Sequence, residues 1–376
     1  MKVYKKQSVY DAALDRIRYL FDEFPNVIVG FSGGKDSTVV LELALIVARE
    51  KNRLPLDVLF IDQEAEWQAT IDMVKRVMYR DEGRPHWLQV PFKMENSTSS
   101  LDMWRNLWGE GEEWIRDKDP IAITDNSFLK KGADTEFYPI FNEYIDYAFK
   151  DKKACVLGGV RTEESPSRFT GLTNLLTYKW ITWGKRLNTE MEHYTFYPIY
   201  DWSYVDVWKA IHDNNWEYCK IYDLMYQHGY AVRNMRVSNL HHATALRHLY
   251  ELQELEPETY EKLVKRMSGI DTAGKLGNDD YYVHELPYMF TDWVEYRDYL
   301  LEKLIIDPEV KAGFAKRFKS MDSTYTAEFV NTEEMTKVQV QSILANDICH
   351  VKMKNWENNP NQILARRRMR GEKVYD

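Results

Sequence analysis

Six consecutive residues near the start of the chain combine backbone and side-chain groups that can bind an anion. Two adjacent glycines can adopt backbone angles closed to other residues, so successive N–H groups can turn inward around a phosphate. A lysine adds a mobile cation, and two serine hydroxyls add neutral donors. The segment therefore predicts a phosphate-binding loop, formed by Ser32, Gly33, Gly34, Lys35, Asp36 and Ser37.

The elements on either side of this segment strengthen that interpretation. The apolar run Val27–Val29 precedes it and is typical of a buried strand, and a helical pattern runs from Thr38 to Glu50. The loop would then lie at the positive end of a helix. Its spacing differs from the Walker A pattern, so a kinase or GTPase of that type is disfavoured. A plain Gly-Gly turn in solvent is the simpler alternative.

Further strands and helices alternate along the first half of the chain. Apolar runs predict strands over 56–62, 86–92 and 154–160, and helical spacing covers 8–23 and 66–79. Strands that alternate with helices predict an α/β fold with a doubly wound, mostly parallel sheet. Ligands of such sheets bind at the carboxyl ends of the strands.

Two more polar clusters follow predicted strands and are expected at the same edge of the sheet. Asp62 ends the second strand and could contact a ribose or a metal ion, or could simply cap the strand end. Gly159 and Arg161 follow the strand 154–160, and Glu164 could orient the arginine. A guanidinium binds phosphate or sulfate through two parallel hydrogen bonds. The alternative is a surface Arg–Glu pair of little consequence.

Length and composition favour a two-part globular protein. The chain has 376 residues and a formal charge of −9, with 44% hydrophobic residues. After residue 200 the pattern becomes helical, so we expect a nucleotide-binding α/β domain over 1–200 and a mainly helical region over 201–376. There is no apolar run of membrane length and no secretory signal pattern, which favours a cytoplasmic protein without membrane contact.

Cysteines and basic residues narrow the candidate partners. The three cysteines, Cys155, Cys219 and Cys349, are too few and too far apart for an intrachain iron–sulfur cluster of the usual kind. The acidic balance argues against a nucleic-acid footprint over the whole protein. A local basic tail is present, and either a solvated end or a surface for a protein or nucleic acid is compatible with its residues Arg366, Arg367, Arg368, Arg370 and Lys373.

Ser32–Ser37 resembles the PP-loop of the adenine nucleotide α-hydrolase superfamily, which includes ATP pyrophosphatases and phosphoadenylylsulfate (PAPS) reductases. The stretch Gly159–Ser165 resembles the Gly-x-Arg-x-x-Glu-Ser signature of PAPS reductases and their relatives. Segments 197–208, 221–226, 234–238 and 255–259 are similar to PAPS reductase-like proteins with a DUF3440-type C-terminal region. That group includes the immunoglobulin-binding regulator A (IbrA) proteins.

The resemblance implies an adenine nucleotide, ATP or PAPS, with its phosphates at the PP-loop and its ribose and base toward Asp62. On this view Lys35, Asp36 and Arg161 are the catalytic residues, and Asp36 and Asp62 are candidate ligands for Mg²⁺. The leading hypothesis is an ATP pyrophosphatase or adenylyltransferase that cleaves the α–β phosphate bond, transfers AMP to an unknown acceptor and releases pyrophosphate.

The chain also departs from the reductases it resembles. PAPS reductases carry a nucleophilic cysteine in a C-terminal Glu-Cys-Gly-Leu-His segment, and this chain has only Cys349 in Asp347–His350. Reduction of PAPS-like nucleotides therefore stands as the second hypothesis. A third is a non-catalytic, nucleotide-sensing regulatory or DNA-associated protein, as the IbrA resemblance suggests.

Overall fold

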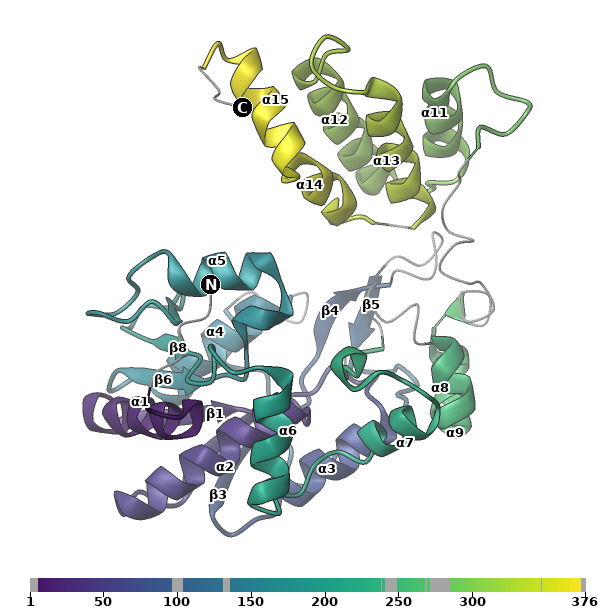
Figure 1. Ribbon diagram of the computed structural model, residues 1–376. Helices are drawn as coiled ribbons and strands as arrows, with labels where there is room; N and C mark the ends of the chain where they lie inside the picture. Colours follow the sequence, from purple (N-terminus) through teal and green to yellow (C-terminus); the bar gives the residue numbers. More distant parts are fainter. Residues whose placement is uncertain are drawn as a thin grey trace. The chain divides into compact units, whose positions relative to one another are not determined.

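The computed structural model describes residues 6–96, 104–130, 136–237, 239–240, 249–267, 269–270, 285–345 and 347–372. The chain forms two compact units (Figure 1). The first comprises Met1–Met94 and Asn106–Asn239, and the second comprises Glu95–Arg105 and Leu240–Asp376. Most of the second unit thus begins after Asn239. The domain boundary expected from the sequence, at residue 200, stays a prediction.

A six-stranded sheet forms the centre of the first unit. Its strand order is β3-β2-β1-β6-β8-β7, and every neighbouring pair is parallel except β7 with β8. This confirms the mostly parallel α/β fold expected from sequence. The bounds are β1 Asn26–Gly30, β2 Leu56–Ile61, β3 Gly83–Leu88, β6 Ala154–Leu157, β7 Gly184–Arg186 and β8 Tyr194–Phe196.

Helices cover the sheet because its central strands are apolar on both faces. Ile28 of β1 packs in one cluster with Ile140 and Ile145 of α4, and successive strand residues point to opposite faces. Val27 and Val29, both buried, therefore face the helices that contact β1 from the other side. The helices of this unit are α1 Val9–Glu23, α2 Lys35–Glu50, α3 Gln68–Met78, α4 Phe137–Ala148, α5 Pro166–Thr173, α6 Tyr204–Asp213 and α7 Ile221–Gln227, with the 3₁₀ turns η1 Thr162–Glu164 and η2 Val232–Asn234.

The strand order places a switch point between β1 and β6. From β1 the chain continues to β2 and β3 on one side, and it later returns to β6 on the other side of β1. The loops that leave the carboxyl ends of β1 and β6 thus start in opposite directions, which opens a crevice at the sheet edge. Both sequence clusters of interest, Ser32–Ser37 and Gly159–Glu164, begin at this point.

One strand differs from its sequence-based prediction. The strand expected over 86–92 is β3 at Gly83–Leu88, followed by a separate short strand, β4 Phe92–Glu95, that pairs with β5 Trp104–Leu107. Pro85 lies inside β3, and proline lacks the N–H needed for a ladder on both sides. It is accommodated because β3 is at the edge of the sheet.

The second unit is helical, as the sequence predicts. Its core contains Trp293, Phe314, Phe318 and Met321. Asp292, Asp307 and Asn331 each cap the following helix by accepting backbone N–H bonds. The helices are α8 Leu249–Leu255, α9 Pro257–Arg266, α11 Trp293–Lys303, α12 Pro308–Thr324, α13 Thr332–Leu344, α14 Val351–Glu357 and α15 Pro360–Met369.

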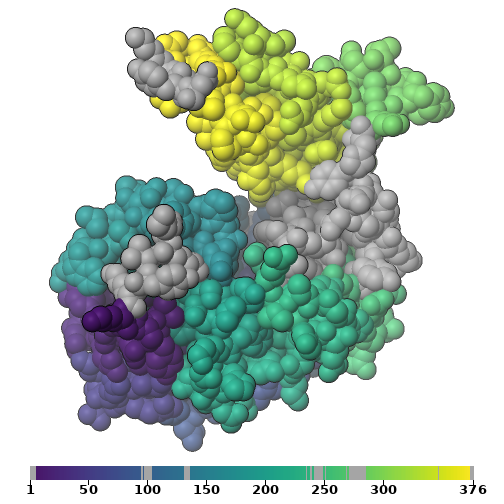
Figure 2. Space-filling view, in the orientation of Figure 1, coloured from purple at the N-terminus to yellow at the C-terminus, as the bar shows by residue number. Residues whose placement is uncertain are grey.

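Segments that are far apart in the sequence lie on one face of the first unit. In Figure 2, residues from the N-terminal part (purple) and from about 150 to 230 (teal) lie side by side. Part of the predicted basic tail belongs to α15, and Lys373 lies outside the described residues. Among the described helices, none is both long and apolar enough to cross a bilayer.

Candidate functional site

The loop between β1 and α2 has the conformation that its glycines allow. Gly33 has a φ of +74°, and a Cβ there would lie 2.7 Å from Thr70 Cγ2. Ser37 Oγ donates to the Gly34 carbonyl at 2.9 Å and accepts from the Ser32 N–H at 3.2 Å. These bonds close the loop over the first turn of α2, where the positive end of the helix dipole favours an anion.

Lys35 is buried at the first position of α2, with only 5% of its surface exposed. Its Nζ donates to the Met235 carbonyl at 3.2 Å and lies 3.3 Å from Asp36 Oδ2. The Tyr222 ring is 5.2 Å from the same nitrogen, and the Tyr222 hydroxyl accepts from the Lys35 backbone N–H at 3.1 Å. Burial lowers the pKa of Lys35, and the Asp36 carboxylate opposes that shift.

The loop after β6 meets the start of α2 directly. A Cβ at Gly159 would lie 2.7 Å from the Asp36 carbonyl carbon and 2.8 Å from Ser37 N, so only glycine fits without a backbone shift. The buried Arg161 donates from Nε to Asp36 Oδ1 at 2.5 Å. Glu164 Oε1 accepts from the Arg161 backbone N–H at 3.1 Å and so orients the arginine loop.

Two further arginines belong to this cluster, and the sequence analysis assigned neither to the site. Arg168 of α5 pairs with Glu164, and its pKa is lowered first by burial and then by the charge of Arg236. The charge of Arg236 also lowers the pKa of Lys35. The spacing of Arg168 four residues after Glu164 was the signal available in the sequence. Four cations therefore gather near the N-terminus of α2.

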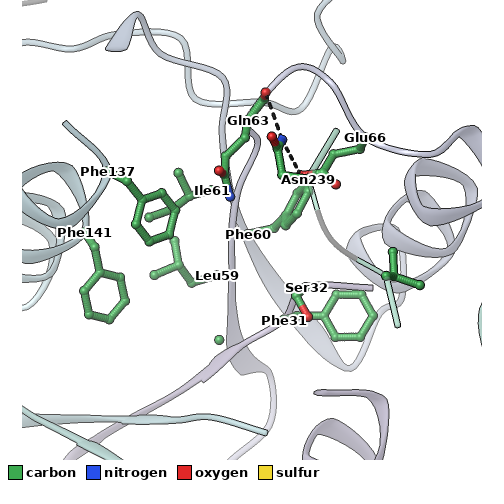
Figure 3. Close-up of a pocket in the computed structure, with 12 residues that line it drawn as sticks. Phe31, Ser32, Leu59, Phe60, Ile61, Gln63, Glu66, Phe137, Phe141 and Asn239 are labelled. Atoms are coloured by element: carbon green, nitrogen blue, oxygen red, sulfur yellow. Dashed lines mark hydrogen bonds between the residues drawn. The ribbon is translucent and has the colours of Figure 1, made fainter. Parts of the chain in front are cut away.

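A pocket of about 220 Å³ opens beside Ser32 at the carboxyl ends of β1 and β2 (Figure 3). One wall is apolar, from Leu59 and Ile61 of β2 and Phe137 and Phe141 of α4. Polar groups lie at the other side, where Gln63, Glu66 and Asn239 gather. A flat apolar heterocycle with a few polar edges suits such a lining.

Asp62 does not face this pocket as an open ligand. Its side chain is fully buried and accepts from Trp87 Nε1 and Gln89 Nε2, each at 2.9 Å. It also accepts from Arg116 and, at 2.9 Å, from the Glu64 backbone N–H. That last bond closes a turn at the end of β2, so the geometry favours the strand-end cap over contact with a ribose.

Glu66 is the carboxylate that does line the pocket, and the sequence analysis did not single it out. It is 7% exposed and accepts from Asn239 Nδ2 at 3.2 Å. Burial raises the pKa of Glu66 to about 7, and the charge of Asp62 acts in the same direction. No motif marked it, because its position follows from the path of the chain between β2 and α3.

The surroundings of the acidic residues and cysteines bear on metal and thiol chemistry. Asp36 is bonded to Arg161, and Asp62 has the four partners described above. Among the described residues, no three His, Cys, Asp or Glu side chains cluster as metal ligands. Cys155 and Cys219 are buried, and Cys349, which belongs to the second unit, is exposed.

Comparison with known proteins places the chain in a family. Residues 26–228 match the phosphoadenosine phosphosulfate reductase domain, which is more than half of the chain. The protein belongs to the phosphoadenosine phosphosulfate reductase domain family. The matched segment contains the phosphate-binding loop, Arg161 and Arg168, and it ends before Arg236 and Asn239.

Individual relatives of this family member cover different shares of the chain. The uncharacterized protein YbdN of Escherichia coli K12 is 30% identical over 321 residues, which is 81% of this chain and 78% of that protein. Adenosine 5′-phosphosulfate reductase of Lysinibacillus sphaericus is 23% identical over 224 residues, which is 59% of this chain and 79% of that protein. The expected IbrA and DUF3440 grouping stays a prediction.

Two solved structures give the structural likeness. Candida glabrata FMN adenylyltransferase aligns with a TM-score of 0.37 and 14% identity, covering 59% of this chain and 64% of that chain. Candida auris PAPS reductase aligns with a TM-score of 0.33 and 17% identity, covering 64% of this chain and 99% of that chain.

Proposed function

We propose that this protein binds ATP and transfers its AMP moiety to an oxygen atom of an acceptor, with release of pyrophosphate. The phosphates of ATP would lie on Ser32–Ser37, and the adenosine would fill the pocket beside Ser32. The observation that carries this proposal is the continuity of the two: an anion-binding loop with buried Lys35 and Arg161 joins an apolar pocket at Ser32.

The proposed step is a displacement at the α-phosphorus of ATP. The acceptor oxygen attacks the α-phosphorus, the bond from that phosphorus to the α–β bridging oxygen breaks, and pyrophosphate leaves with the electron pair. The acceptor's proton goes to solvent. Negative charge grows on the leaving pyrophosphate, so the N–H groups at the start of α2 and the ammonium group of Lys35 would stabilise it.

Arg161 and Asp36 have complementary roles in this scheme. The 2.5 Å bond between them holds the guanidinium beside the first turn of α2, where it can contact a phosphate oxygen. Arg168 and Arg236 add positive charge to the same region. Asp36 and Asp62 stay sequence-based candidates for Mg²⁺ ligands; in the structure Asp36 pairs with Arg161 and Asp62 accepts from four donors, so no step of the proposed reaction depends on a metal held by them.

Two other activities compete with this proposal. Turnover of a sulfonucleotide fits the family, and one relative is named adenosine 5′-phosphosulfate reductase. It needs an accessible thiol, either from an external donor or from Cys349, the only exposed cysteine in the described part of the chain. A regulatory protein that binds nucleotide without turnover is the other, and the basic residues of α15 would be its surface for a protein or nucleic acid.

Labelled ATP distinguishes these functions. The purified protein is incubated with α-³²P-ATP and cell extract, and the release of pyrophosphate and the transfer of labelled AMP to an acceptor are compared among wild type, Lys35→Ala and Lys51→Ala. Lys51 is the matched control, because it follows the other end of α2 and pairs with Asp22 at 2.6 Å. We expect release by wild type and Lys51→Ala only. Bound but intact ATP in every extract would favour the regulatory protein, and turnover of PAPS alone would favour the reductase.

A further inference from the structure

Among the described residues that line the pocket beside Ser32, the ionisable side chain is a carboxylic acid. Glu66 is its only acidic residue, and among the described residues that line the pocket none is Lys, Arg or His. The other lining groups are apolar side chains, backbone, the hydroxyl of Ser32 and the amides of Gln63 and Asn239. Among the described residues that line the pocket, none carries a positive charge that could neutralise an additional phosphate.

We propose that this pocket selects nucleotides whose ribose hydroxyls are free and rejects those with a 3′-phosphate, with Glu66 as the specificity-determining residue. The inference rests on the proposed function, because it requires the adenosine to occupy the pocket beside Ser32. It assigns the site to ATP-like ligands and against PAPS, which carries a 3′-phosphate.

A carboxylate distinguishes the two kinds of ribose by simple chemistry. A hydroxyl can donate a hydrogen bond to it, whereas a phosphate offers only acceptors and negative charge. The same logic operates in dinucleotide-binding folds, where an acidic residue binds a free ribose hydroxyl and an arginine accommodates the phosphorylated form. Like charges about 6 Å apart at the edge of a protein repel strongly enough to lower affinity on the order of 100-fold.

The structure also fixes where Glu66 can act. Asn239 Nδ2 lies 3.2 Å from Glu66 Oε1 and 3.3 Å from the Gln63 carbonyl oxygen (Figure 3). The same nitrogen is 3.1 Å from the Ala65 carbonyl oxygen. These contacts hold the carboxyl group at the polar side of the pocket. Asp62 at the end of β2 and Arg116 are the charged groups that act on it. Lys35 and Arg161 lie at the phosphate end, bonded to Met235 and Asp36.

Competition binding with two ligands that differ only in the 3′-phosphate tests the proposal. The ligands are ADP and the same molecule carrying a 3′-phosphate, each competed against a fluorescent ATP analogue at pH 8. We expect wild type to prefer ADP on the order of 100-fold. In Glu66→Gln, which keeps an oxygen acceptor for Asn239, the preference should fall to within about fivefold.

Two controls make the result specific. Glu50→Gln carries the same chemical change at the far end of α2, where Glu50 pairs with Arg18 at 2.8 Å, and should keep the wild-type preference. Between pH 8 and pH 6 the preference should shrink more in wild type than in Glu66→Gln, because the phosphate titrates in both proteins while the raised pKa of Glu66, about 7, neutralises the carboxyl only in wild type.

The outcomes separate this inference from the proposed function. Equal affinity for both ligands in wild type, or a preference that survives Glu66→Gln, overturns the role of Glu66 while ATP binding that depends on Lys35 still supports the proposed function. Failure of the ATP analogue to bind wild type overturns both.

Discussion

The two ends of the candidate site, the Ser32–Ser37 loop and the pocket beside Ser32, carry charges of opposite sign. At the phosphate end, Lys35 and Arg161 are buried and share the Asp36 carboxylate, with Arg168 and Arg236 close by. At the other end, which we propose binds the nucleoside, Glu66 is equally buried and accepts a hydrogen bond from a neutral amide, Asn239. Excess positive charge at one end and a lone carboxylate at the other match a ligand with an anionic tail and hydroxyl donors.

Asp62 and Glu66 show two different environments for a buried carboxylate, one compensated within the protein and one that lines a pocket. Both are buried near the end of β2, four residues apart. Asp62 has an arginine and three neutral donors, so its charge is satisfied within the protein. Glu66 lines a pocket and its pKa is raised, which is the state of a carboxylate that lacks a strong cationic partner.

The largest expected effect comes from removing Asp62. Asp62→Ala removes one acceptor each from Arg116, Trp87 and Gln89, and we expect a loss of about 3–5 kcal/mol in the free energy of unfolding, measured with urea. Asp72→Ala, at an exposed position of α3, should stay within about 0.5 kcal/mol of wild type. A loss below about 1 kcal/mol for Asp62→Ala would contradict the structural role of Asp62 and favour its predicted role as a ligand.

The pH dependence of stability tests the environment of Glu66. Its pKa is raised from 4.5 to about 7 in the folded protein, so its neutral form is favoured there. The stabilising contribution is full below pH 4.5 and is lost as the pH rises through about 7. The stability of wild type relative to Glu66→Gln should therefore fall by up to about 3 kcal/mol between pH 4.5 and 8.

Urea unfolding of both proteins across that range gives the difference directly, because the other titrating groups cancel. A difference that does not change with pH would mean that the charge of Glu66 is compensated, and the contrast between the two ends would be lost.

Gly159 tests the packing of the phosphate end. Gly159→Ala brings a methyl group within 2.8 Å of the backbone of Asp36 and Ser37, so we expect a loss of about 1–3 kcal/mol and a shifted arginine loop with weaker ATP binding. Gly171→Ala is the matched control, because a Cβ there meets nothing within 4 Å in α5 and should stabilise by about 0.5–1 kcal/mol. Equal effects of the two substitutions on thermal unfolding would contradict the close approach.

The smallest expected effect concerns Arg236. It is exposed, so Arg236→Ala should leave stability within about 0.5 kcal/mol of wild type. ATP affinity, measured by calorimetry, should fall about five- to tenfold and become less sensitive to salt, because one cation near the phosphates is gone. Arg84→Ala, an exposed arginine paired with Asp57 at 3.0 Å, should bind ATP like wild type. Equal affinities in the two variants would remove Arg236 from the phosphate end.

Much of the fold follows from the sequence because local patterns determine it. The apolar runs that become β1, β2 and β6, and the helical spacing of α1 to α3, are visible without a structure. The short strands β7 and β8 were not predicted, since three-residue strands carry too little pattern. β3 begins earlier than the predicted strand because it includes Pro85. A proline is tolerated in β3, since this edge strand has a neighbouring strand on one side only.

The site divides in the same way. The phosphate-binding loop and Arg161 are sequence motifs, and the structure brings them within hydrogen-bonding distance. The other residues meet only in the folded chain. Asn239 returns to Glu66 after β2, and Arg168 and Arg236 return to the start of α2. Asp62 was expected to face a ligand because of its position after a strand, and only the structure shows how many donors surround it.

The most direct test of this account is a crystal structure with an ATP analogue whose α–β bridge cannot be hydrolysed. We predict that its phosphates accept hydrogen bonds from the backbone of the Ser32–Ser37 loop near Lys35 and Arg161. Its adenosine should fill the pocket with a ribose hydroxyl toward Glu66. An analogue bound elsewhere, or with its base at the α2 end and its phosphates in the apolar pocket, would contradict the account.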